Sequence, residues 1–168
     1  MTINKKGEVI DHKIAETVIK TNRRMTYTNV KKILADKDAA VIEEYKELVP
    51  MFEKMAELAA ILRKKRMKRG SIDFDFPETK VVLDEDGHPI DIKPYDRNVA
   101  TKLIEDFMLI ANETVAEDYF WQEIPFVYRT HDKPDSEKIA KLSTFINNFG
   151  YTLHIGADEV HPRSFRSF

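Results

Sequence analysis

The sequence predicts an α+β fold that is mainly helical, with short antiparallel strand pairs. Two segments, around residues 4–7 and 84–88, place a glycine in a short polar turn between apolar runs, which is typical of a hairpin. Three longer segments, 39–69, 96–121 and 135–149, repeat apolar residues every three or four positions, which is the period of an amphipathic helix. A chain of 168 residues is long enough to bury a core.

Composition excludes several classes of protein. The chain has no cysteine, so disulfides and thiolate metal sites are excluded, and we expect a reducing, cytoplasmic location. No apolar run approaches the roughly 20 residues that a membrane helix needs. The formal net charge of -2 favours neither nucleic acid nor any other partner.

The first half of the chain predicts a hairpin and then helices. Residues 2–19 alternate loosely around a turn at Gly7. Thr26 or Thr28 can cap a short helix that runs through Leu34. Pro50 interrupts the helical pattern of 39–69, so either the helix kinks there or a second helix begins with proline in its first turn.

The end of that helix is strongly basic and is followed by Gly70. Six cations exceed what is needed to complement a helix dipole, so they form either a solvated helix end or a phosphate-contacting patch. The six are Arg63, Lys64, Lys65, Arg66, Lys68 and Arg69.

Residues 72–76 alternate in the manner of a strand. Phe74 and Phe76 would share an apolar face with Ile72, and Asp73 and Asp75 would share the opposite face. Two carboxylates without a third ligand make a weak metal site, so we expect a solvated face and assign no metal ligand. Phe74 is expected in the core, unless it lines a groove in which bases stack.

A second hairpin and a long helix follow. The loop 84–88 lacks the remaining ligands of a calcium site and is expected to be a plain turn. Asp96 or Asn98 caps a helix through about Trp121. Glu105 and Asn112 are seven residues apart and share one face of it, which is either solvated or the wall of a polar site.

The last third predicts a buried strand over 124–128 and a helix that Asp135 or Ser136 caps and Gly150 ends. The five histidines show no metal-ligand spacing. Periodicity alone therefore identifies no catalytic site.

Several motifs in register carry more information. The stretches are 24–27 (RMTY), 72–77 (IDFDFP), 103–112 (LIEDFMLIAN), 125–131 (PFVYRTH) and 142–151 (LSTFINNFGY). In this order they resemble the catalytic domain of the ribonuclease II family, and most closely its bacterial ribonuclease R members.

The resemblance implies hydrolysis of single-stranded RNA, including structured RNA that bears an overhang. Hydrolysis would proceed processively from the 3′ end, release nucleoside monophosphates and use Mg²⁺ held by aspartates. It implies that Glu105 is the active-site glutamate, that Tyr27 lies beside the terminal nucleotide, and that Phe74, or Phe76 across a one-residue gap, stacks on a base. Asn112 is assigned with Tyr27 and Phe74 to RNA binding. A carboxylate and a phenol suit a ribose 2′-hydroxyl, which both donates and accepts.

The resemblance also implies what this chain lacks. The family's aspartate cluster would lie upstream of Met1 and its catalytic arginine downstream of Phe168. We therefore expect 1–168 to be an internal part of the catalytic domain that binds no Mg²⁺ by itself, is inactive alone, and self-associates through surface exposed by truncation. The alternative is a non-catalytic module that binds RNA or a protein through the basic segment.

Overall fold

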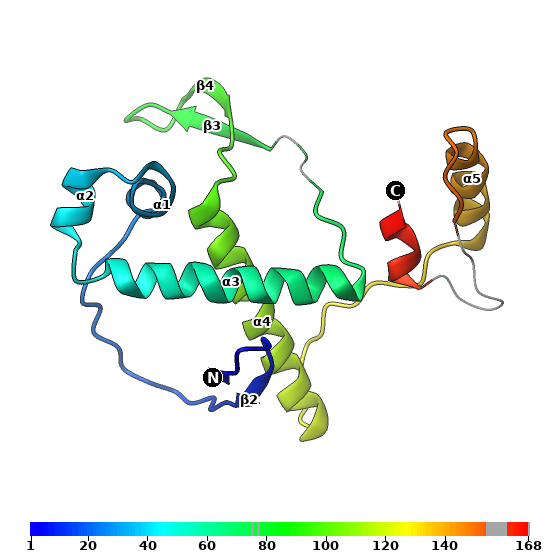
Figure 1. Ribbon diagram of the computed structural model, residues 1–168, viewed down its shortest axis with the longest axis horizontal. Coiled ribbons are helices and arrows are strands. Elements are labelled where there is room, and N and C mark those ends of the chain that lie inside the picture. The colour runs from blue at the N-terminus through cyan, green and yellow to red at the C-terminus, as the bar shows by residue number, and fades with distance from the viewer. Residues whose placement is uncertain (75, 77, 154–160, 168) are drawn as a thin grey trace. The chain divides into compact units, whose positions relative to one another are not determined.

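The computed structural model describes residues 1–74, 76, 78–153 and 161–167 (Figure 1). The fold is mainly helical with two antiparallel strand pairs, as predicted. The chain divides into two discontinuous units. The first comprises Met1–Thr17, Ala60–Ile72 and Asp106–Phe168, and the second comprises Val18–Ala59 and Asp73–Glu105.

The first unit begins with the predicted hairpin. Strands β1 (Thr2–Ile3) and β2 (Val9–Asp11) pair around a turn in which Gly7 has φ 73°. The Asn4 carboxamide oxygen accepts the backbone N–H groups of Lys6 and Glu8 at 2.8 and 3.0 Å. The prediction of strand as far as residue 19 is wrong, because β2 ends at Asp11 and the residues after it are mostly exposed to solvent.

Gly7 lies close to the second half of helix α3 (Val49–Arg69). A Cβ atom at Gly7 would lie 3.1 Å from Cγ2 of Ile61, and Nζ of Lys65 donates to the Gly7 carbonyl at 2.8 Å. The turn thus requires glycine both for its positive φ and for this approach.

The second unit contains the buried cluster Val30, Ile33, Phe52 and Ala100. Val30 belongs to α1 (Tyr27–Lys31) and Ile33 to the π-helix η1 (Lys32–Asp36). Helix α2 (Ala39–Glu44) packs apolar side chains against the cluster. The Thr26 hydroxyl caps α1 by accepting from the Asn29 N–H at 3.2 Å. Helix α3 then begins at Val49 with Pro50 in its first turn, which decides between the two expectations for the proline.

The second hairpin repeats the turn chemistry of the first. Strands β3 (Thr79–Leu83) and β4 (Pro89–Pro94) pair around Gly87, which has φ 86°. The Asp84 carboxylate accepts the N–H groups of Asp86 and His88 at 3.0 and 2.7 Å. These hydrogen bonds confirm the predicted hairpin turn.

Local signals also set the ends of the long helices. Gly70 ends α3 with φ 106°, and the Ser71 N–H donates to the Arg66 carbonyl at 3.3 Å. Helix α4 (Val99–Trp121) begins after Asn98, whose Oδ1 accepts from the Ala100 N–H at 2.9 Å. Both helices contribute residues to the two units. Among the described residues, no helix is both long and apolar enough to cross a bilayer.

Two of the strand predictions are wrong. The described residues of 72–76 form no strand, and Asp75 lies outside the described residues. Phe74 and Phe76 are 61% and 72% exposed and stack on each other with ring centroids 5.2 Å apart, so Phe74 is not a core residue. Alternation alone did not make a strand, because β3 and β4 pair only with each other in the described part of the chain.

Residues 124–128 also form no strand, and Val127 is 92% exposed. The Phe126 ring instead packs against Tyr119 with centroids 4.8 Å apart. Helix α5 (Ser136–Asn147) is confirmed, with Asp135 as its cap. A 3₁₀ helix, η2 (Pro162–Ser167), follows near the end of the chain.

Candidate functional site

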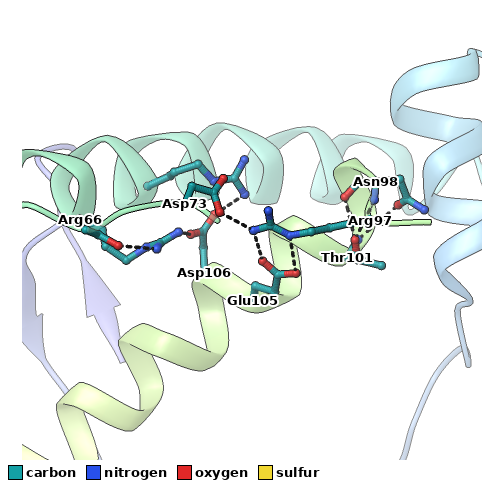
Figure 2. Close-up of polar contacts among 9 residues, drawn as sticks. Arg66, Asp73, Arg97, Asn98, Thr101, Glu105 and Asp106 are labelled. Atoms are coloured by element: carbon teal, nitrogen blue, oxygen red, sulfur yellow. Dashed lines mark hydrogen bonds and ion pairs between the residues drawn. The ribbon is translucent and has the colours of Figure 1, made fainter. Parts of the chain in front are cut away.

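Arg97 joins two carboxylates in the second unit. Its Nε donates to Oε1 of Glu105 at 3.2 Å, and its Nη2 donates to Oε2 of the same carboxylate at 2.8 Å. The same Nη2 donates to Oδ1 of Asp73 at 2.7 Å. Figure 2 shows the guanidinium lying between the two acids.

Local structure puts these groups in place. Arg97 directly precedes the cap residue Asn98, and Glu105 lies in the second turn of α4. The Arg97 side chain is 21% exposed. Hydrogen bonds to Glu105 and then to Asp73 raise the pKa of Arg97 above its ordinary value, so the guanidinium stays charged.

A cavity of about 330 Å³ opens beside Glu105 and Arg97. It is also lined by Phe76, Glu78, Pro94, Tyr95 and Asp96. Carboxylate acceptors beside aromatic rings suit a ligand that carries both hydroxyl donors and a flat ring.

Tyr27 lies at a different cavity of the same unit. This cavity measures about 480 Å³, and Tyr27, the first residue of α1, lies at it beside apolar side chains. Those include Met25, Val30, Phe52, Met55 and Leu103. Tyr27 and Glu105 thus belong to one unit but line separate cavities.

The basic segment of α3 lies in the first unit, and its three arginines are paired with acids of α4. Nη2 of Arg63 lies 2.6 Å from Oδ2 of Asp106, and Nη2 of Arg66 lies 3.3 Å from Oδ1. The Asp106 side chain is only 1% exposed. Arg69 donates to both oxygens of Glu113 at 3.1 and 2.6 Å.

These pairs divide the six cations by role. The three arginines hold α3 against α4 within the first unit, and the bond to Glu113 raises the pKa of Arg69. Lys65 donates to the first hairpin, whereas Lys64 and Lys68 are exposed. The two expectations for this segment, a solvated helix end and a phosphate-contacting patch, both missed the arginine pairs.

Asn112 is exposed on α4 in the first unit, whereas Glu105 of the same helix belongs to the second unit.

Sequence reasoning missed Arg97 and Asp106. Asp106 carried a signal, because it lies three residues after the buried Leu103, and an acid on a buried face requires a partner. Arg97 carried none: it precedes its helix and pairs with an acid eight residues on, outside the spacing of helix-surface pairs.

The described part of the chain offers one group of side chains that could hold a metal ion, but its donors are a poor match for Mg²⁺. Within the described residues, Asp84, Asp86 and His88 bring ligand atoms within 4.8 Å of one another, but all are exposed and Asp84 is occupied by the turn. Asp73 and Glu105 are paired with Arg97. Carboxylates that arginine neutralises are poor ligands for a hard cation, so neither Asp73 nor Glu105 is assigned to a metal.

Comparison with known proteins then identifies the family. The model of the RNB domain matches residues 1–165. The chain belongs to the RNB domain family. It is 41% identical to ribonuclease R 2 of Lactococcus lactis over 92% of this chain and 24% of that protein. It is 40% identical to ribonuclease R of Thermotoga maritima over 96% of this chain and 22% of that protein.

A solved RNase R structure agrees with the fold. Mycoplasma genitalium RNase R in complex with ribose methylated single-stranded RNA matches with a TM-score of 0.64 and 30% identity, over 83% of this chain and 21% of that one. The chain thus spans about a fifth to a quarter of the relatives that it matches. The resemblance to ribonuclease R is confirmed.

Proposed function

We propose that residues 1–168 are an internal part of the catalytic domain of a ribonuclease R-like, cytoplasmic exoribonuclease. The whole protein would hydrolyse single-stranded RNA, and structured RNA with an overhang, processively from the 3′ end to nucleoside monophosphates. The observation that carries this proposal is the RNB match over residues 1–165. Two similar Mycoplasma genitalium RNase R structures hold single-stranded and double-stranded RNA, which supports RNA as the substrate.

Glu105 is proposed to face the ribose of the bound RNA. Both oxygens of the Glu105 carboxylate accept from Arg97, and an ionised carboxylate is an acceptor that suits a hydroxyl donor from the substrate. Tyr27 would lie beside the terminal nucleotide, the exposed Phe74 would stack on a base, and Asn112 would contact RNA. Exposure of the Phe74 ring supports stacking, because a buried ring could not meet a base.

Mg²⁺ is proposed to be held by aspartates of the whole protein that lie outside this chain, where it would activate water and neutralise charge on phosphorus. This chain's residues would bind and orient RNA. Orientation without the metal leaves the charge of the transition state unbalanced, so the chain alone is proposed to be inactive. Self-association through its exposed apolar side chains belongs to the same proposal.

The test changes Glu105 in the full-length protein. Losing a hydrogen bond to a charged group costs about 1.5–3 kcal/mol, so Glu105→Gln should lower turnover of RNA about 10- to 150-fold. RNA affinity should change little, because phosphate contacts dominate it. The control is Glu117→Gln, which changes an exposed glutamate of the same helix and should leave turnover unchanged. Full turnover by Glu105→Gln would overturn the assignment.

The rival function is a non-catalytic module that binds RNA through the basic segment. It is less well supported, because Arg63, Arg66 and Arg69 are already paired with acids. Salt-dependent RNA binding by the full-length protein, with no dependence of any activity on Glu105, would favour it.

A further inference from the structure

We infer that Arg97 is a positioning residue that fixes Glu105 and the Phe74 segment together, and so sets the preference for a ribose over a deoxyribose. The inference rests on the proposed function and deepens it. Its basis is one guanidinium that donates to Glu105 and to Asp73 within the second unit (Figure 2).

The first step is the orientation of the Glu105 carboxylate. Arg97 contacts both of its oxygens, at 3.2 and 2.8 Å, in a two-point arrangement that fixes the plane of the carboxylate. A glutamate side chain on a helix surface otherwise samples several rotamers. Because hydrogen bonding is directional, an oriented carboxylate accepts from a hydroxyl at one place and not from others.

The second step is the segment that carries Phe74. Residues 71–74 have no regular secondary structure, and the Phe74 and Phe76 rings are exposed. Asp73, the neighbour of Phe74, lies 2.7 Å from Nη2 of Arg97. Arg97 therefore ties this irregular segment to the start of α4, where Glu105 lies.

The third step is the consequence for a substrate. A ribose hydroxyl that meets Glu105 and a base that meets Phe74 belong to adjacent parts of one RNA strand. Because one guanidinium holds both Glu105 and the Phe74 segment, it sets the distance between them. Without Arg97, both side chains lose their alignment with the RNA, and a misplacement of about 1 Å costs about 100-fold in rate.

The test compares two substrates in the full-length protein: an RNA, and the same RNA ending in 2′-deoxynucleotides. Arg97→Met should lower kcat/KM on the RNA about 100-fold and lower it much less on the deoxy-ended substrate, so the ratio between the two falls. Arg97→Lys keeps the charge without the planar fork and should give an intermediate ratio. Lys31→Met removes the ion pair to the neighbouring Asp96 and should leave the ratio unchanged.

Two further variants complete the test. The double variant Arg97→Met/Glu105→Gln should show the same ratio between the two substrates as Glu105→Gln alone, because Arg97 acts on the ribose through Glu105. Asp73→Asn should raise KM and leave kcat nearly unchanged, because it loosens the segment that stacks on a base.

The outcomes distinguish the inference from the proposed function. Equal losses on both substrates, for Arg97→Met and Arg97→Lys alike, would show a merely structural role and overturn the inference. If the ratio of kcat/KM between RNA and the deoxy-ended substrate fell in Glu105→Gln but stayed unchanged in Arg97→Met, the inference alone would be overturned. Unchanged RNA turnover in Glu105→Gln would overturn the assignment of Glu105 as well, whereas failure of the unchanged full-length protein to release mononucleotides would overturn the proposed function.

Discussion

The pairing of Asp106 with two arginines predicts a large loss of stability when its charge is removed. Asp106→Asn preserves the shape of the side chain and removes the negative charge that Asp106 places beside Arg63 and Arg66. Breaking a buried ion pair costs about 3–5 kcal/mol. Because the two arginine side chains remain 31% and 18% exposed, we expect the lower end, about 3 kcal/mol.

Thermal and urea unfolding of the 168-residue chain, followed by circular dichroism, measure this loss. For a chain of this size each kcal/mol shifts Tm by about 2–4 °C, so Asp106→Asn should lower Tm by about 6–12 °C. The matched control is Glu113→Gln, two turns further along α4, which breaks the more exposed pair with Arg69 and should cost at most about 1 kcal/mol. Equal losses in the two variants would refute the reasoning.

Two further predictions concern the hairpin turn and an exposed pair. Gly7 and Gly87 both have positive φ, which costs an alanine about 1–2 kcal/mol, but only at Gly7 would the new Cβ meet Ile61, at 3.1 Å. Gly7→Ala should therefore lower the free energy of unfolding by about 1 kcal/mol more than Gly87→Ala, and equal losses in urea would contradict this. Lys31 lowers the pKa of Asp96, so the stability that this pair contributes is present at neutral pH and lost as pH falls through that lowered pKa. The difference in Tm between the parent and Asp96→Asn should vanish well below pH 3.9, the approximate ordinary value, and a constant difference would exclude the pair as its source.

Features that depend on neighbouring residues could be predicted from the sequence. The caps at Thr26 and Asp135 and both hairpin turns rest on side chains within a few residues of the backbone groups that they satisfy. The stop at Gly70 rests on the positive φ of that residue alone. Helices need no distant partner for their hydrogen bonds, so their period and caps suffice to place them.

Features that depend on distant residues could not be predicted from the sequence. A strand needs a partner, and the alternation of 72–76 and 124–128 carries no information about whether one is present. The contact between Arg97 and Asp73 joins residues 24 apart, and that between Arg63 and Asp106 joins residues 43 apart. The roles expected of Tyr27 and Glu105 came from the family resemblance, because periodicity left the face of Glu105 undecided.

The central claim is that this chain forms one part of a larger exoribonuclease site. The most direct measurement is degradation of an RNA with a 3′ overhang in the presence of Mg²⁺, by this chain and by the full-length protein side by side. We predict that only the full-length protein releases mononucleotides. Release of mononucleotides by the 168-residue chain alone would contradict the claim, because carboxylates now assigned to ion pairs and turns would then have to hold the metal.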